Sequence, residues 1–289
     1  MSRKRLLEGL AAISVVASMG TYTAVMAGAS SAGLSAAPSA GATTAGLSAS
    51  TTSPTAAPAQ PGSSGTVQIL DLPSGDADGK SREVWVYRPD VPDSADLPVV
   101  YLLHGYPGND LDVEQIHLAD LLDQQFAAGA APFVVVVPNG QSDIHPDTEW
   151  ADSVDGEVRL ETFIVSTAIP AVEGANRRDA AHRSIAGFSM GGYGSMNLAE
   201  HHPDLFGQVV SIAGYYHTDD PDGMGGASPV WDADNSPDQN IDTLAGTRTL
   251  LIADAEESDP LILGEAARFA DLQRVAGQNP TLVVAPGNH

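Results

Sequence analysis

The chain has 289 residues, of which 37 are Asp or Glu and 13 are Lys or Arg, so its formal net charge is −24. Such a charge argues against binding to nucleic acid and against docking on an anionic membrane surface. The chain has no cysteine, which excludes disulfides, thiolate metal sites and a lipid-modified cysteine.

The first residues predict an export signal. A basic start at residues 3–5 precedes an apolar stretch, and Ala27-Gly28-Ala29 offers a small-residue cleavage site, so residues 1–29 are expected to be a cleaved signal peptide. An uncleaved membrane anchor is the alternative, because the apolar stretch is about long enough to span a bilayer. We expect a secreted or cell-wall-associated protein with no stable membrane contact after cleavage.

A linker and one folded domain are expected to follow. Residues 30–65 are almost wholly Ala, Ser, Thr, Gly and Pro, which is typical of a disordered linker. Residues 66–289 are then a single domain, long enough to bury a substantial core.

Strands alternate with helices along this domain. Residues 67–70 and 83–87 predict an antiparallel hairpin at a sheet edge, because turn residues join two β-rich runs. Further apolar runs predict buried strands, and 3.6-residue spacing predicts helices, one of which contains Pro170 and is expected to kink or shorten there. The strands are expected at 99–103, 133–137, 184–186, 209–213, 249–253 and 281–285, and the helices at 112–128, 159–172, 193–201 and 261–275. This order predicts an α/β fold with a mostly parallel sheet and helices on both faces.

A serine lies at the turn between a predicted strand and the helix after it. The motif is Gly187-Phe188-Ser189-Met190-Gly191. In such a turn the apical residue is strained, and glycines two positions before and after avoid collisions with the neighbouring strand and helix. The helix then directs its free N–H groups and its positive dipole end at the serine. Ser189 is therefore predicted to be a nucleophile.

A serine nucleophile needs a histidine base, and the histidine needs a carboxylate. In this architecture the chain order is serine, acid, histidine. The last strand is followed by His289, which we predict to be the base, although it is also the final residue. His217 is the alternative base, because it lies on the long polar loop 214–240, within reach of the predicted site.

The acid is less well defined, because four carboxylates follow the strand at 249–253. Asp259 is predicted from its spacing before the next helix, and Glu257 and Asp254 are the alternatives.

Two backbone N–H groups are expected to bind the developing oxyanion. One belongs to Met190, directly after the nucleophile, and the other to Tyr106, in the loop after the strand at 99–103. His104, in the same loop, is expected to hold the loop by hydrogen bonds rather than to act as a base.

Several motifs together resemble the esterase D-like (putative esterase) family, which includes feruloyl esterases, S-formylglutathione hydrolase and the secreted mycolyltransferases. They are His104-Gly105, 138–142, Glu161-Thr162-Phe163, 187–192 and His202-Pro203-Asp204-Leu205-Phe206. The resemblance implies an α/β-hydrolase fold, an acyl-serine intermediate, no metal and no organic cofactor. It supports Ser189, His289 and the backbone of Tyr106 and Met190, and it places an acid near Asp259. Relatives continue beyond the position of His289, so the domain is expected to be truncated at its C-terminus.

Three functions remain open from the sequence. The first is hydrolysis of a small-molecule or polysaccharide-linked carboxylic ester through an acyl-serine. The second is acyl transfer to a sugar or polyol hydroxyl, and the third is a non-catalytic, surface-associated binding role. The sequence does not predict the acyl group, the alcohol or the oligomeric state.

Overall fold

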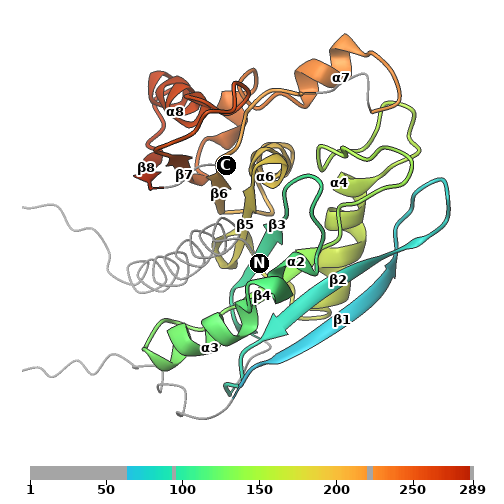
Figure 1. Ribbon diagram of the computed structural model, residues 1–289, viewed down its shortest axis with the longest axis vertical. Helices are drawn as coiled ribbons and strands as arrows, with labels where there is room; N and C mark the ends of the chain where they lie inside the picture. Colours follow the sequence, from blue (N-terminus) through green and yellow to red (C-terminus); the bar gives the residue numbers. More distant parts are fainter. Residues whose placement is uncertain (1–63, 93–95, 220–223, 287–289) are drawn as a thin grey trace, which may run out of the picture.

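Eight strands form one sheet at the centre of the fold (Figure 1). The computed structural model describes residues 64–92, 96–219 and 224–286, so the predicted signal peptide, most of the predicted linker and His289 lie outside the described residues. In chain order the strands are β1 (Thr66–Pro73), β2 (Ser81–Arg88), β3 (Val99–Leu103), β4 (Val134–Pro138), β5 (Arg183–Phe188), β6 (Gln208–Ile212), β7 (Arg248–Asp254) and β8 (Thr281–Ala285).

The spatial order of the strands is β1-β2-β4-β3-β5-β6-β7-β8. Strand β1 pairs antiparallel with β2, and β2 pairs antiparallel with β4, whereas all later pairs are parallel. The predicted edge hairpin and the mostly parallel sheet are therefore confirmed. Because β3 to β8 run the same way, their carboxyl ends meet at one edge, where ligands bind in such sheets.

Helices cover both faces of the sheet (Figure 1). One core cluster packs the helices between residues 112 and 127 against strand residues such as Val100 and Val135. The other packs the helices within 160–173, 190–201 and 265–275 against the intervening strand residues, such as Tyr101 and Val136. Successive strand residues point to opposite faces, so both faces are buried. The helices are α2 (Asp112–Gln115), α3 (Leu118–Ala127), α4 (Leu160–Phe163), η2 (Ile164–Ala168), α5 (Ile169–Glu173), η3 (Ala180–His182), α6 (Met190–His201), α7 (Pro229–Asp234), η4 (Ile241–Leu244) and α8 (Glu265–Val275).

Two predicted helices differ from the structure. The helix expected at 112–128 is two helices, because His117 between them has a left-handed backbone with φ of 54°. The helix expected at 159–172 is continuous but contains the π-helical turn η2 just before Pro170. A π turn widens the backbone ladder, so the missing N–H and the ring of a proline are accommodated without a break.

The remaining boundaries shift by a few residues. The helix after Ser189 begins at Met190, three residues earlier than predicted, and α8 begins at Glu265 rather than at residue 261. The loop 214–240 contains the short helix α7, whose N-cap Ser228 accepts a hydrogen bond from the Trp231 N–H.

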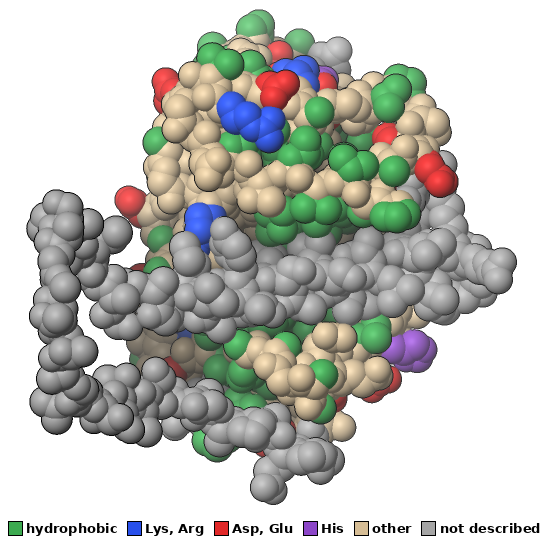
Figure 2. Space-filling model, turned by 90° about the vertical axis from the view of Figure 1, so that its left-hand side faces the viewer, with side chains coloured by type: hydrophobic (Ala, Val, Ile, Leu, Met, Phe, Trp, Pro, Cys, Tyr) green, Lys and Arg blue, Asp and Glu red, His purple; other side chains and the backbone are tan. Residues whose placement is uncertain are grey.

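The edge strand β8 is only partly covered. Val283 is 43% exposed and Val284 is 63% exposed. Figure 2 looks onto the side of the molecule that carries β8 and α8, and apolar side chains gather there. No helix among residues 64–92, 96–219 and 224–286 combines the length and the apolar character that crossing a bilayer requires.

Two adjacent histidines tie the carboxyl end of α6 to α4. Glu161 accepts hydrogen bonds from His201 Nδ1 and His202 Nε2, each at 2.8 Å. Burial alone would raise the pKa of Glu161, but the two histidine hydrogen bonds outweigh it and lower that pKa to about 2. Burial likewise opposes the charge on His201, yet the Glu161 hydrogen bond and charge raise its pKa to about 9. These histidines therefore hold the two helices together.

Glu161→Gln should lower the free energy of unfolding by about 1–3 kcal/mol at pH 6, because it removes a partly buried charged hydrogen-bond acceptor. Since the pKa of His201 is raised in the folded state, the contribution of its charge to the free energy of unfolding is complete below pH 6.5. This contribution is lost as pH rises through about 9. Since the pKa of Glu161 is lowered, its contribution is complete above pH 4.5 and is lost as pH falls toward about 2.

Urea unfolding of both proteins from pH 4 to pH 10 measures this difference. Asp179→Asn is the control, because it removes a similar but exposed pair with His182. A difference between wild type and Glu161→Gln that does not shrink between pH 6.5 and pH 10 would contradict the assignment.

Candidate active site at the turn between β5 and α6

Ser189 occupies the sharp turn between β5 and α6 in a strained backbone conformation. Its φ is 56° and its ψ is −121°, a region that residues with a Cβ rarely adopt and that costs about 1–3 kcal/mol. Its N–H donates to the Ile212 carbonyl at 2.9 Å, and its own carbonyl accepts from the Tyr193 N–H at 3.0 Å. Two backbone hydrogen bonds thus hold Ser189 in this conformation.

The Ser189 side chain does not cap α6. Serine is common at the first position before a helix, where its oxygen accepts a hydrogen bond from the helix backbone. Such a cap needs an extended backbone with a negative φ, whereas the φ of Ser189 is positive. The helix α6 therefore has no side-chain cap. Ser189 is half-buried, and its side chain is not used to satisfy the N–H groups of the helix.

The flanking glycines are required by close backbone contacts. A Cβ on Gly187 would lie 2.1 Å from the Gly191 carbonyl oxygen, and a Cβ on Gly191 would lie 2.2 Å from the Leu103 carbonyl oxygen. Any larger residue at either position would push β3, β5 and α6 apart. The prediction drawn from the glycine spacing agrees with this packing.

The two segments that are expected to supply the oxyanion-binding N–H groups both lie against the turn at Ser189. Met190 is the first residue of the twelve-residue helix α6 and is buried. The loop after β3 lies against the same turn, since a Cβ on Gly105 would come within 3.1 Å of both the Phe188 carbonyl oxygen and the Ser189 Cβ. Tyr106 follows Gly105 in this loop, and its side chain is 52% exposed. The two residues predicted to form the oxyanion hole thus belong to segments that flank Ser189.

Both ring nitrogens of His104 are engaged in hydrogen bonds to the backbone. Nε2 accepts from the Gly140 N–H at 2.8 Å, and Nδ1 lies 3.0 Å from the Gly105 carbonyl oxygen, to which it donates. Burial lowers the pKa of His104 to about 4, so the imidazole is neutral at neutral pH, as these two bonds require. His104 therefore joins the loop after β3 to the loop after β4.

Trp150 supports the same loops, a role that no motif in the sequence indicates. Its Nε1–H donates to the His104 carbonyl at 3.0 Å. Its fully buried ring packs so closely that a Cβ on Gly140 would lie 2.6 Å from it, and a Cβ on Gly194 would lie 2.4 Å from the Trp150 Cβ. A single side chain thus contacts both loops and α6.

A buried carboxylate next to Trp150 connects the long loop 214–240 to the site. Glu149 is fully buried, and its Oε1 accepts from the Tyr215 hydroxyl at 3.4 Å and the Asp219 N–H at 3.2 Å. Tyr215 stacks on Tyr193 of α6 with 4.9 Å between ring centroids. Desolvation, reinforced by the Glu149 charge, raises the pKa of both tyrosines well above its usual value.

The three candidate acids differ in their surroundings at the end of β7. Asp259 is exposed, and its side chain accepts a hydrogen bond from the Leu261 N–H at 3.0 Å. Glu257 is half-buried, and its Oε1 accepts from the N–H groups of Ser258 and Asp259, each at 2.7 Å. Asp254 is the last residue of β7 and pairs with Ala285 of β8.

The structure leaves the base position undescribed. His289 lies outside the described residues, but β8 ends at Ala285 on the sheet edge where β5 also ends. His217, the alternative, has Nδ1 3.7 Å from a carboxylate oxygen of Glu265 at the start of α8. Within the described residues, the one group of three His, Asp or Glu side chains whose ligand atoms lie close enough to share a metal ion includes neither Ser189 nor the acids after β7.

Known proteins with similar sequences are esterases. An esterase of Mycobacterium tuberculosis strain H37Rv is 29% identical over 185 residues, which cover 54% of this chain and 38% of that protein. The putative esterase NocK of Nocardia uniformis is 29% identical over 177 residues, covering 56% of this chain and 49% of that protein. The matched region is thus less than half the length of these curated relatives.

Solved structures share the fold. A ferulic acid esterase is 25% identical with a TM-score of 0.67, covering 78% of this chain and 92% of that chain. MPT51 (FbpC1) of Mycobacterium tuberculosis is 25% identical with a TM-score of 0.56, covering 76% of this chain and 90% of that chain. These neighbours confirm the α/β-hydrolase fold. Residues 76–256 match the family described as "Putative esterase", and the chain therefore belongs to that family.

Proposed function

We propose that this chain is a serine esterase that cleaves carboxylic esters through an acyl-serine intermediate. The observation that carries the proposal is the backbone of Ser189, strained to a φ of 56° at the head of α6 with a side chain that does not cap the helix. Strain of this kind persists only where the surrounding structure enforces it, and it is concentrated at functional sites. The relatives named esterases support the same chemistry.

In the proposed reaction the Ser189 Oγ attacks the ester carbonyl carbon while His289 accepts its proton. The carbonyl oxygen becomes negatively charged and is stabilised by the N–H groups of Met190 and Tyr106. The imidazolium then protonates the leaving alkoxide as the ester bond breaks, leaving the acyl group on Ser189. A water molecule, deprotonated by His289, releases the acid and restores the serine.

Glu257 suits the role of the acid better than Asp259. A triad carboxylate must be held in one orientation and shielded from water, so that it fixes the tautomer of the histidine. The two backbone N–H groups on Glu257 Oε1 hold this half-buried side chain, whereas Asp259 is exposed and caps the turn at Leu261. We therefore assign the acid to Glu257, in place of the residue favoured by spacing.

The substrate is proposed to be a small or polysaccharide-linked ester, in keeping with the ferulic acid esterase among the structural neighbours. An acyl-serine can also be passed to a sugar hydroxyl instead of water, and both outcomes use the same residues. The export signal expected at residues 1–29 favours action outside the cell.

Ser189→Ala should lower the hydrolysis of p-nitrophenyl acetate by about 10³-fold or more, because no other group can form the acyl intermediate. The same change should abolish labelling by a fluorophosphonate probe. Ser81→Ala, at an exposed serine of β2, is the matched control and should leave both unchanged. Full turnover or full labelling of Ser189→Ala would refute the serine mechanism.

Glu257→Gln should lower kcat by about 10²–10⁴-fold, because the histidine loses the carboxylate that stabilises its charged form. Asp259→Asn, two residues away, should retain activity within about twofold, since it changes only an exposed turn. Steady-state kinetics of both variants distinguish the two acids. The reverse pattern would return the assignment to Asp259.

His104→Ala should lower kcat about 10–100-fold, because the loop that carries Tyr106 loses its link to Gly140. It should also destabilise the fold by about 1–3 kcal/mol, since the Gly140 N–H loses its acceptor. His104→Gln supplies a new acceptor oxygen and should recover part of both losses. His182→Ala, at an exposed histidine, controls for loss of an imidazole. Unchanged kcat in His104→Ala would exclude the positioning role.

A further inference from the structure

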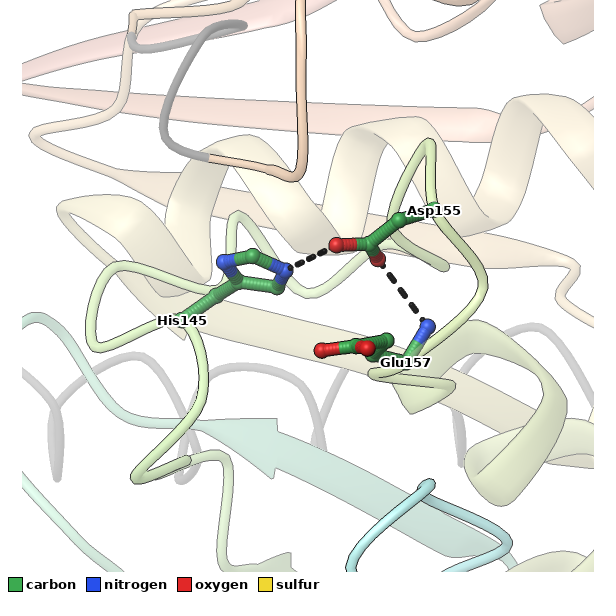
Figure 3. A group of neighbouring side chains, drawn as sticks. All are labelled: His145, Asp155 and Glu157. Carbon is green, nitrogen blue, oxygen red and sulfur yellow. Dashed lines mark hydrogen bonds and ion pairs between the residues drawn. The ribbon is translucent and has the colours of Figure 1, made fainter.

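Three potential metal ligands meet between two neighbouring turns, outside the proposed catalytic residues (Figure 3). They are His145, Asp155 and Glu157, and one ligand atom from each lies within 4.8 Å of the other two. His145 comes from the loop after β4, and the two carboxylates come from a turn that ends just before α4. This is the one such group in the described part of the chain.

The turn fixes the orientation of the Asp155 carboxylate. Its Oδ1 accepts from the Ser153 hydroxyl at 2.6 Å and from the Glu157 N–H at 3.0 Å. Its Oδ2 is left directed at His145, whose Nε2 lies 3.0 Å away (Figure 3). The His145 side chain is 13% exposed, and the side chain of Asp155, at the surface, is 30% exposed. Two of the three ligand atoms are therefore already positioned.

The backbone around His145 is also fixed. The Ser142 hydroxyl oxygen accepts hydrogen bonds from the N–H groups of Ile144 at 3.1 Å and His145 at 3.4 Å. The Thr148 hydroxyl donates to the Gly140 carbonyl at 2.9 Å, which closes the loop. The imidazole is consequently presented by an ordered loop, at little entropic cost to a ligand that binds it.

Two residues of the long loop, Met224 and Gly225, lie against the same cluster. The Val154 N–H donates to the Met224 carbonyl at 2.7 Å. Gly225 packs so closely that a Cβ there would lie 2.2 Å from the Asp155 Cγ. An ion held by this cluster would therefore stabilise the contact between the two loops that border the Ser189 turn.

An ion pair between His145 and Asp155 does not account for the third side chain. No hydrogen bond or ion pair to the Glu157 carboxylate occurs among the described residues, although it lies within 4.8 Å of the Asp155 carboxylate. Two ionised carboxylates this close repel each other. A divalent cation between them would remove that repulsion.

We propose that His145, Asp155 and Glu157 bind one divalent transition-metal ion of the Zn²⁺ type. One imidazole nitrogen and two carboxylate oxygens suit Zn²⁺ better than Mg²⁺ or Ca²⁺, which prefer oxygen ligands alone. Bonds of about 2.0–2.2 Å bring tetrahedral ligand atoms to within about 3.5 Å of one another. The exposed Glu157 side chain therefore moves inward by roughly 1 Å, and water completes the coordination. The ion joins two loops and takes no part in the ester chemistry.

Isothermal titration calorimetry with ZnCl₂ tests the site on the full chain, freed of any affinity tag and of bound metal by chelator and dialysis. Wild-type protein should bind one equivalent with a micromolar or lower Kd. Glu157→Gln should weaken binding at least about tenfold. It keeps the His145–Asp155 pair and the backbone N–H bond to Asp155, so a loss of affinity identifies a metal site rather than an ion pair. His145→Ala should abolish binding.

His182→Ala is the matched control, because this histidine also pairs with an aspartate, Asp179, at 2.7 Å but belongs to no three-ligand group among the described residues. It should bind Zn²⁺ like the wild type. Zn²⁺ should also raise the Tm of the wild type and of His182→Ala but not that of Glu157→Gln. Absence of saturable binding to the wild type, or equal affinity in Glu157→Gln, would overturn the proposal.

Discussion

The close approach of three backbone segments around Ser189 is the constraint on which the site depends. The carbonyl groups of Gly191 and Leu103 lie where a Cβ on Gly187 or Gly191 would stand. This contact fixes α6 tightly on β3 and β5, and it forces Ser189 into a backbone that cannot cap the helix. The N-terminus of α6 therefore lies directly after Ser189, at the carboxyl edge of the sheet where ligands bind in folds of this kind.

The loops that complete the site are held by side chains that take no part in the proposed reaction. Neutral His104 bridges the loops after β3 and β4, and Trp150 packs between these loops and α6. Glu149 extends the same support to the loop 214–240. Because all three side chains are anchored to backbone groups, the position of each loop depends on the others. A rigid frame of this kind allows oxyanion donors to be oriented before the substrate binds.

Carboxylates in the interior of this acidic protein and carboxylates on its surface differ in their partners. Two carboxylates that are covered by the fold have cationic partners: buried Glu173 pairs with Arg183, and half-buried Glu161 pairs with two histidines. Partners are needed there because an unpaired charge in the interior is costly. Surface carboxylates have few cations to meet, since acids outnumber Lys and Arg by 37 to 13. Two of them come together beside an imidazole at Asp155 and Glu157, where the proposed metal ion supplies a positive charge.

The sequence by itself determined the order of the strands and helices and the serine turn, because these depend on local periodicity and on glycine spacing. It could not reveal Trp150, the Glu161–histidine cluster or the His145 group, since their partners are up to 46 residues away along the chain. Nor could spacing supply the burial and backbone contacts on which the proposed choice of Glu257 over Asp259 rests. Local patterns specify the elements, whereas contacts between distant segments arise only when the chain packs, and so the tertiary structure alone decided them.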